Sequence, residues 1–243
     1  MIDTVSPLRL TPSGEADLKL YYGGTFDPFH RGHLAIARAA RDVMNCSVTL
    51  IPAADPPARP APGASAGQRL HMIELAIASE HQLNVDECEL QRARQLTGPS
   101  YTVDTLKALR LRLGQAVPIA WLLGADAFAQ LMQWHRWQDI IQLAHLVVAD
   151  RQITPAHQRL ANTLASTLFT EQVTSADALR MAPFAKLMWL HQPMCSVSAT
   201  HVRAEIAART AQWASFVHPA VAQYIRQEKL YLPKTASRAA DLG

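Results

Sequence analysis

Two histidines closely follow a pair of glycines near the start of the chain, in the segment Gly23-Gly24-Thr25-Phe26-Asp27-Pro28-Phe29-His30-Arg31-Gly32-His33. Glycine lets a backbone approach a phosphate closely, because it has no side chain. His30 and His33 are three residues apart, a spacing that places both rings on one side of a helix. Imidazole can donate hydrogen bonds to phosphate oxygens. The segment therefore predicts a site for a phosphate-bearing ligand.

The residues around this segment predict a strand before it and a helix after it. Residues 18–22 are mostly apolar and form the expected strand, and apolar residues recur at helical spacing from His33 to Met44. In an open parallel sheet, ligands bind beyond the carboxyl ends of the strands. The helix that follows points its unpaired N–H groups and the positive end of its dipole at them. The predicted position thus suits a phosphate.

Two other chemistries could use a histidine pair or a glycine turn. A catalytic zinc ion needs three protein ligands, and no Cys, Glu or further His near His30 and His33 completes the set at a familiar spacing. We therefore assign no metal ligands. The segment also lacks the lysine followed by Ser or Thr of a P-loop, and it does not match the G-x-G-x-x-G dinucleotide fingerprint.

A second candidate for phosphate binding is the segment Val197-Ser198-Ala199-Thr200-His201-Val202-Arg203. Ser198 or Thr200 can cap a following helix, whose first amides then face an anion. Arg203 suits a polyphosphate because its planar guanidinium donates two hydrogen bonds at once. Alone, this pattern predicts an ordinary capped helix. Together with the first segment, it predicts the other side of a triphosphate site.

Strands and helices alternate along the rest of the chain, which predicts a parallel sheet covered on both faces. Further strands are expected at residues 47–51, 83–85, 117–123, 146–149 and 187–190, and further helices at 68–80, 102–113, 126–132, 137–143, 156–167, 200–209 and 218–227. Five prolines within residues 52–62 exclude regular structure there. We expect a flexible leader at 1–17, one domain at 18–233 and a flexible tail at 234–243.

Composition excludes several classes of protein. The chain has 243 residues, of which 49% are hydrophobic and 18% charged, as in an ordinary globular protein. A net charge of +3 is too small for a dedicated nucleic-acid-binding protein, so we expect no nucleic-acid partner. No run of apolar residues is long enough to span a membrane, and we expect no membrane partner. Three scattered cysteines without a C-x-x-C motif favour a reducing compartment, the cytoplasm.

The segment GGTFDPFHRGH resembles the H-x-G-H signature of the nucleotidyltransferase superfamily, and its GGTFDP part is similar to that of bacterial nicotinate-nucleotide adenylyltransferases. The resemblance covers about residues 19–232 and is loose over 151–185. It implies an α/β fold, a Rossmann-like doubly wound parallel sheet with C-terminal helices. It also implies ATP as adenylyl donor, Mg²⁺ carried with the ATP, and nicotinate mononucleotide as acceptor.

The resemblance also implies roles for individual residues. Catalysis is assigned to His30 and His33 at the α- and β-phosphates and to Arg203 at the departing pyrophosphate. Facing phosphates are expected to favour charged imidazolium rings. The expected ATP-binding residues are Gly23, Gly24, Thr25, Phe26, Gly124, Asp126, Ser198 and Thr200, where Gly124 and Asp126 resemble the G-x-D motif that contacts the ribose.

On the acceptor side, the segment Pro99-Ser100-Tyr101-Thr102-Val103-Asp104-Thr105-Leu106 matches the P-S-Y-T-x-x-T-L pattern of the nicotinate-specific branch. Without the resemblance, Thr102 would be only a helix cap. The expected substrate-binding residues are Arg59, Thr102, Trp134 and His135, with Trp137 close by in the same aromatic stretch. Ala58 stands where the family usually has a histidine near the substrate phosphates, whereas Arg59 keeps the cation.

Three other functions stay open. The acceptor could be nicotinamide mononucleotide or another phosphorylated compound such as phosphopantetheine, although the chain is long for the latter enzyme and P-S-Y-T favours nicotinate. A nucleotide sensor could keep the fold without chemistry, but His30, His33 and Arg203 are all intact. A metal-dependent hydrolase built on the two histidines ranks third.

Overall fold

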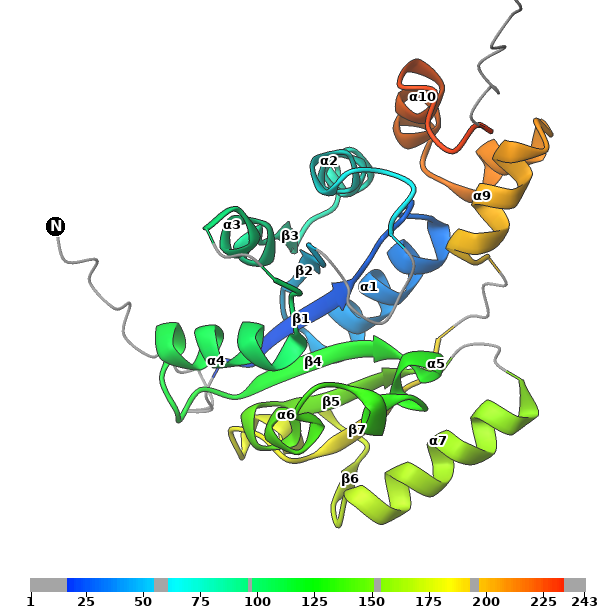
Figure 1. Cartoon of the computed structure of the whole chain (residues 1–243). Coiled ribbons are helices and arrows are strands. Elements are labelled where there is room, and N and C mark those ends of the chain that lie inside the picture. The colour runs from blue at the N-terminus through cyan, green and yellow to red at the C-terminus, as the bar shows by residue number, and fades with distance from the viewer. Residues whose placement is uncertain (1–16, 55–60, 96–97, 151–153, 193–196, 234–243) are drawn as a thin grey trace, which may run out of the picture.

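The computed structural model describes residues 17–54, 61–95, 98–150, 154–192 and 197–233. At its centre is a parallel sheet whose strands are β1 Lys19–Gly24, β2 Val48–Pro52, β3 Leu83–Val85, β4 Ile119–Gly124, β5 His145–Ala149, β6 Gln172–Val173 and β7 Leu187–Leu190. The seven strands lie in the order β3-β2-β1-β4-β5-β7-β6 (Figure 1). All of the pairings between them are parallel. The α/β fold predicted from the sequence is confirmed.

Helices cover both faces of this sheet. They are α1 Arg31–Met44, α2 Ala66–Ile77, α3 Cys88–Gln95, α4 Thr102–Leu113, α5 Ala125–Phe128, α6 Trp137–Leu143, α7 Pro155–Leu168, α8 Ala176–Arg180, α9 Ala199–Ala207 and α10 Pro219–Gln227, with 3₁₀ turns η1 Leu131–Gln133 and η2 Gln212–Phe216. None of the helices in the described ranges is both long and apolar enough to span a membrane.

Alternate residues of the strands feed two separate cores, because successive side chains of a strand point to opposite faces. In β1, Leu20 and Tyr22 pack with α1, α8, α9 and α10, whereas Tyr21 packs with α4, α5, α6 and α7. The same division holds in β4, where Leu122 joins the first core and Trp121 the second. The sheet is therefore doubly wound, and α9 and α10 lie toward the end to which β1 points (Figure 1).

The chain changes direction at β1. It builds β2 and β3 on one side of β1, and it then crosses over to place β4 on the other side. In such sheets a crevice opens between the loops that leave the two strands at the point of reversal. Tyr22 pairs with Leu122 in the register, so the glycines that end β1 lie level with Leu123 and Gly124 at the end of β4. The predicted site therefore lies at this edge of the sheet.

Some elements differ from the sequence-based expectation. Pro52 ends β2 instead of starting the irregular segment. Helix α3 was not predicted, because only Leu90 and Glu89 of its eight residues are buried and it has no apolar stripe. The short elements β6 and α8 were also not predicted. The proposed leader and tail lie outside the described residues except for Asp17.

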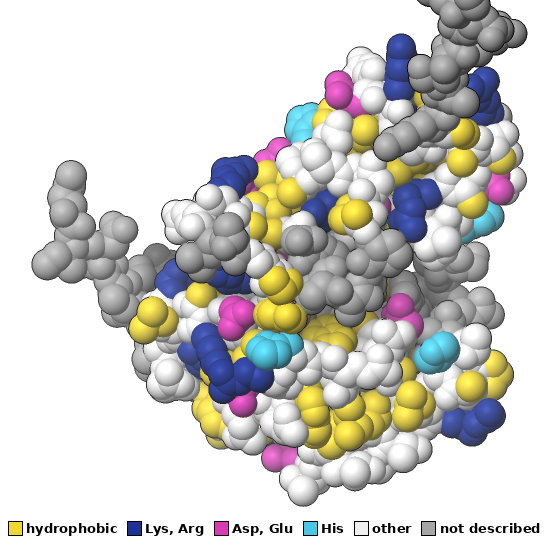
Figure 2. All heavy atoms as spheres, in the orientation of Figure 1, with side chains coloured by type: hydrophobic (Ala, Val, Ile, Leu, Met, Phe, Trp, Pro, Cys, Tyr) yellow, Lys and Arg dark blue, Asp and Glu magenta, His cyan; other side chains and the backbone are white. Residues whose placement is uncertain are grey.

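The surface view places lysine and arginine side chains in separate groups over the visible face (Figure 2). They alternate there with acidic, polar and apolar side chains. This scatter on one face accords with a net charge of only +3.

His145 is a fully buried histidine at the start of β5. Its Nδ1 accepts a hydrogen bond from the backbone N–H of Lys186 at 3.1 Å, and its Nε2 donates to the carbonyl oxygen of Ala182 at 2.8 Å. The ring is thus neutral. Burial lowers the pKa of His145 from 6.5 to about 4.

We predict that His145 makes the protein less stable as the pH falls from about 6.5 to about 4. The unfolded chain binds a proton in this range and the folded chain does not, so the free energy of unfolding should drop by about 2 kcal/mol between pH 7 and pH 5. Urea unfolding at the two pH values measures the drop. His145→Asn should reduce it, whereas the exposed His81→Gln should leave it; an unchanged drop in His145→Asn contradicts the prediction.

Candidate functional site

The loop that leaves β1 is shaped by two glycines and an aromatic residue. A Cβ atom added to Gly23 would lie 2.1 Å from Cζ2 of Trp121, so only glycine allows β1 to pass this indole. Phe26 adopts a left-handed backbone conformation, with φ of 52°, that a bulky residue rarely takes. Its buried ring packs edge-on against Tyr22 and His33, with ring centroids 5.3 and 5.0 Å away. Tertiary packing thus fixes this turn.

His30 and His33 form a reciprocal cap at the start of α1. The Nδ1 atom of His30 accepts from the backbone N–H groups of Gly32 and His33, at 3.1 and 3.4 Å, and the Nδ1 atom of His33 accepts from the backbone N–H of His30 at 3.3 Å. This is a capping box in which histidines replace the usual Ser or Thr and Glu or Gln. The two rings stack with centroids 3.7 Å apart.

The cap determines which nitrogen of each ring carries the proton. Because Nδ1 accepts a hydrogen bond in both residues, each ring carries its proton on Nε2 and is neutral. A charged imidazolium has hydrogens on both nitrogens and could not accept at Nδ1. The expectation of charged rings concerns rings that face bound phosphates, and it stays a prediction. The pair supplies Nε2–H donors, and His30 itself is only 2% exposed.

Asp27 is the acidic residue of this loop, and its carboxylate accepts several hydrogen bonds. It is 5% exposed, and its Oδ2 accepts from the backbone N–H of Gly63 at 2.8 Å. Its Oδ1 accepts from the N–H of Ala64 at 3.1 Å and from the hydroxyl of Tyr231 at 2.8 Å. Burial and then the adjacent carboxylate raise the pKa of Tyr231, so the phenol keeps the proton that it donates. The sequence analysis gave Asp27 no role of its own.

Arg203 reaches the same loop from α9. Its Nη1 donates to the carbonyl oxygen of Asp27 at 2.6 Å and lies 3.7 Å from the Asp27 carboxylate, while its Nη2 donates to Oγ1 of Thr200 at 3.4 Å. Ser198 is the cap of α9, because its Oγ accepts from the N–H of His201 at 3.1 Å. The two predicted phosphate-binding segments are therefore in direct contact.

Arg69 is a residue of this region that the sequence analysis missed. It is 1% exposed, and its guanidinium donates to the carbonyl oxygens of Thr25 at 2.7 Å and Ala54 at 3.0 Å. It thus joins the loop after β1 to the loop after β2. A signal was available, because Arg69 occupies the buried stripe of α2 together with Met72 and Ile73. An arginine at an apolar position of a helix indicates a tertiary contact.

The residues predicted to bind the rest of the nucleotide follow β4. Gly124 is the N-cap of α5, and the half-buried Asp126 lies in the first turn of that helix. Because β4 pairs with β1, this turn is adjacent to the glycine loop. The structure therefore brings these two residues to the edge of the sheet that carries His30.

The residues predicted for the acceptor form a second group beside this edge. Tyr101, at the start of α4, packs its ring against His135 with centroids 4.3 Å apart. Tyr101 is the N-cap residue and Thr102 the first helical residue, so Thr102 is not a helix cap. Trp134 and Trp137 pack partly buried against the second core. Arg59 and Ala58 lie outside the described residues, and the role of Arg59 stays a prediction.

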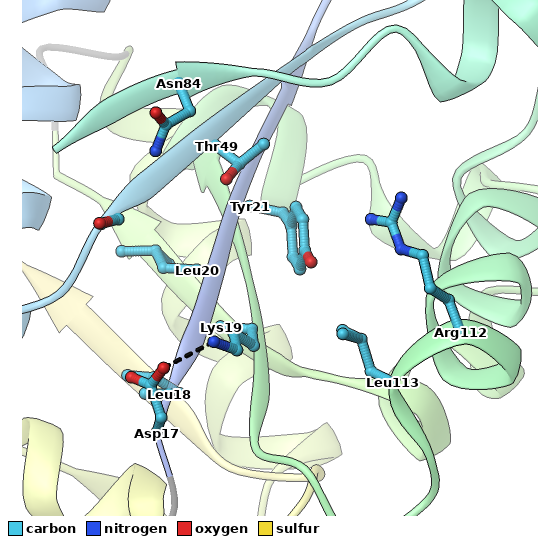
Figure 3. A pocket seen from close by; sticks show the side chains of 10 residues that line it. Asp17, Leu18, Lys19, Leu20, Tyr21, Thr49, Asn84, Arg112 and Leu113 are labelled. Atoms are coloured by element: carbon cyan, nitrogen blue, oxygen red, sulfur yellow. Dashed lines mark hydrogen bonds and ion pairs between the residues drawn. The ribbon is translucent and has the colours of Figure 1, made fainter. Parts of the chain in front are cut away.

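The described ranges contain no group of three or more His, Cys, Asp or Glu side chains that could hold a metal ion. A cavity of about 420 Å³ lies at the amino ends of β1 and β2, at the opposite end of β1 from the glycine loop (Figure 3). Its two cations are already paired, Lys19 with Asp17 at 2.6 Å and Arg112 with Asp86 at 2.9 Å. This cavity is therefore not part of the site described above.

The sequence is similar to a known protein family and to several named proteins. The model of the family described as "Cytidylyltransferase-like" matches residues 21–205. A protein of Stenotrophomonas maltophilia (strain K279a), named "Probable nicotinate-nucleotide adenylyltransferase", is 47% identical over 90% of this chain and 98% of its own length. A protein of Xylella fastidiosa (strain 9a5c) with the same name is 47% identical over 88% of this chain and 96% of its own.

Solved structures share the fold. The nicotinic acid mononucleotide adenylyltransferase of Plasmodium falciparum, solved in complex with NaAD, superposes with a TM-score of 0.64 over 88% of this chain and 97% of its own, at 15% identity. The extent of the family match and the identity to full-length relatives decide the classification. The chain belongs to the cytidylyltransferase-like family and, within it, to the nicotinate-nucleotide adenylyltransferases.

Proposed function

We propose that the chain transfers the adenylyl group of ATP to nicotinate mononucleotide, which gives deamido-NAD and pyrophosphate, a step of NAD biosynthesis. The observation that carries this proposal is the contact of the two phosphate-binding segments through Asp27 and Arg203, at the edge of the sheet where β1 and β4 end. The similarity to relatives named for this activity supports the choice of acceptor.

The reaction needs no nucleophile from the protein. A phosphate oxygen of the mononucleotide forms a bond to the α-phosphorus of ATP, the bond between that phosphorus and the bridging oxygen breaks, and pyrophosphate leaves with the electron pair. The protein contributes position and charge stabilisation. His33 and His30 donate from Nε2 to the α- and β-phosphates. Their neutral rings need not lose a proton to any group during the reaction.

Further groups hold the rest of ATP. Arg203 and Ser198 bind the pyrophosphate, since the Ser198 hydroxyl can donate while its oxygen caps α9. The remaining ATP-binding residues of the proposal are Gly23, Gly24, Thr25 and Phe26 at the phosphates, Thr200 beside Arg203, and Gly124 and Asp126 at the ribose. The mononucleotide is bound by Thr102, Trp134, His135 and Arg59.

Mg²⁺ fits this site as an ion that arrives with ATP and neutralises triphosphate charge. The described groups at the loop are mainly N–H donors, which suit phosphate oxygens and not a cation. Asp27 is the carboxylate within the loop, and it already accepts from two backbone N–H groups and a hydroxyl. Phosphate oxygens, and not side chains of the described ranges, would therefore hold the ion.

The cytoplasmic location and the lack of a nucleic-acid partner stay predictions. Burial raises the pKa of the described thiols, to about 11 for Cys46 and to about 12 for Cys88. Such thiols hold their protons at neutral pH and react slowly.

We predict that His33→Gln reduces turnover by a factor of order 100. Glutamine at this position of a capping box can still accept the N–H of His30, so α1 keeps its cap while the imidazole donor is lost. Pyrophosphate release from ATP in the presence of nicotinate mononucleotide measures the effect. The exposed His157→Gln in α7 is the matched control, and near-normal turnover in His33→Gln would refute the assignment.

We predict that nicotinate mononucleotide is used about tenfold or more faster than nicotinamide mononucleotide at equal low concentrations, because the carboxylate gains charge-assisted hydrogen bonds that an amide lacks. The measurement is dinucleotide formation with each acceptor, ATP and Mg²⁺. Equal rates contradict the preference. Binding of either mononucleotide without any pyrophosphate release identifies a sensor instead.

We predict that Tyr231→Phe lowers the free energy of unfolding by about 1 kcal/mol, because Asp27 loses one of its three hydrogen-bond donors. Urea unfolding at pH 7 measures the change. Tyr224→Phe in α10 makes the same chemical change at a tyrosine that does not contact Asp27, and it should have little effect. A Tyr231→Phe protein as stable as the parent chain contradicts the prediction.

A further inference from the structure

A closed ring of four polar side chains joins α3 to the start of α4. Glu89 of α3 is 5% exposed. Its Oε2 accepts from the hydroxyl of Ser100 at 2.9 Å and its Oε1 from the hydroxyl of Thr105 at 2.6 Å. Arg92, one turn further along α3, donates from Nη2 to the same two hydroxyl oxygens, at 3.0 and 2.8 Å. Thr105 itself is fully buried.

The direction of every hydrogen bond in this ring is fixed. A hydroxyl has one hydrogen to donate, and Arg92 cannot accept, so Ser100 and Thr105 accept from Arg92 and donate to Glu89. The Thr105 hydroxyl also lies 3.5 Å from the carbonyl oxygen of Tyr101, a longer contact than the 2.6 Å to Glu89. Both oxygens of Glu89 are then acceptors. Each of the four side chains constrains two others, and such networks in a dry interior are rigid when they are fully satisfied. If an amide replaced the Glu89 carboxylate, one of its two acceptor atoms would become an N–H donor. That donor would face a hydroxyl whose hydrogen also points at it.

The ring holds the backbone on both sides of Tyr101. No side chain caps α4 at Tyr101, so Glu89 and Arg92 restrain the start of this helix from outside. The Tyr101 ring then packs against His135, which belongs to the turn between η1 and α6. The hydroxyls of Ser100 and Thr105, in the segment 99–106, thus bind α3. We take Tyr101 and Thr102 as the residues of this segment that face a ligand.

We propose that Glu89 is a positioning residue that sets the affinity for the mononucleotide acceptor by holding Tyr101 against His135. This inference rests on the proposed function and assigns a role to a residue that does not touch the substrate. The loop for ATP is restrained by other contacts, those of Asp27, Arg69 and Arg203, and none of these involves α3. Loss of the Glu89 carboxylate should therefore weaken acceptor binding and spare ATP.

The test is Glu89→Gln, which keeps the size of the side chain and exchanges one acceptor for a donor. We expect the KM for nicotinate mononucleotide to rise about tenfold, as for the loss of one charge-assisted hydrogen bond, with kcat and the KM for ATP within about twofold of the parent chain. Glu87→Gln is the matched control, since Glu87 lies two residues away and pairs with Arg94 at 3.8 Å, outside the ring. It should change neither KM.

A second pair of variants tests the ring without altering its charge. Thr105→Val removes the hydroxyl at nearly constant volume and should raise the KM for the acceptor, whereas Thr105→Ser keeps the hydroxyl and should restore it. The proposal is overturned if folded Glu89→Gln and Thr105→Val leave this KM unchanged. It is also overturned if both variants raise the KM for ATP equally, because the ring would then act on the general stability of the fold.

Binding measurements separate this inference from the proposed function. Trp134 and Trp137 flank His135, so their fluorescence can report the Kd for nicotinate mononucleotide without turnover. If the parent chain binds the mononucleotide but forms no dinucleotide, the proposed function fails, and the ratio of Kd values between the parent and Glu89→Gln still decides the role of Glu89. If the parent chain does not bind it, both proposals fail.

Discussion

The carboxylate of Asp27 is the constraint on which the arrangement of the site depends. A buried negative charge is costly unless hydrogen bonds surround it. Here backbone N–H groups before α2 and the hydroxyl of Tyr231 donate to the carboxylate. Arg203 lies 3.7 Å from it and donates to the backbone carbonyl oxygen of the same Asp27. Contacts with the single residue Asp27 thus hold together three segments that are remote from it in sequence. The residues proposed to bind phosphate acquire their geometry as a result, with Arg203 facing the loop.

The site combines two kinds of hydrogen-bond donor that behave differently. Arg69 is buried beneath the loop, and its N–H groups donate to backbone carbonyl oxygens, so it stabilises the backbone. His30 and His33 are neutral and reciprocally capped, so they add direction without adding charge. Two charged rings only 3.7 Å apart would repel each other, and the cap removes that repulsion. Precise donors next to a highly charged substrate are a form of electrostatic preorganisation.

Local sequence patterns predicted much of the fold, because buried parallel strands are short apolar runs and helices repeat every three to four residues. They also singled out His30, His33 and Arg203, whose two segments the structure brings into contact. They failed where long-range contacts decide the outcome. No local sequence pattern predicts the hydrogen bond between Asp27 and Tyr231 or the contacts of Glu89 that hold α3. Nor does any predict that His30 and His33 cap α1 through their Nδ1 atoms. Arg69 was partly predictable, because the sequence places it on the apolar stripe of a helix but does not identify the carbonyl oxygens that it binds.

The hydrogen bond between Tyr231 and Asp27 spans 204 residues and has a consequence for synthesis of the chain. A ribosome finishes the glycine loop early and supplies its last support only after nearly the whole domain has emerged. Until then the Asp27 carboxylate has one donor fewer. The carboxylate therefore gains its third donor only after translation has passed this tyrosine.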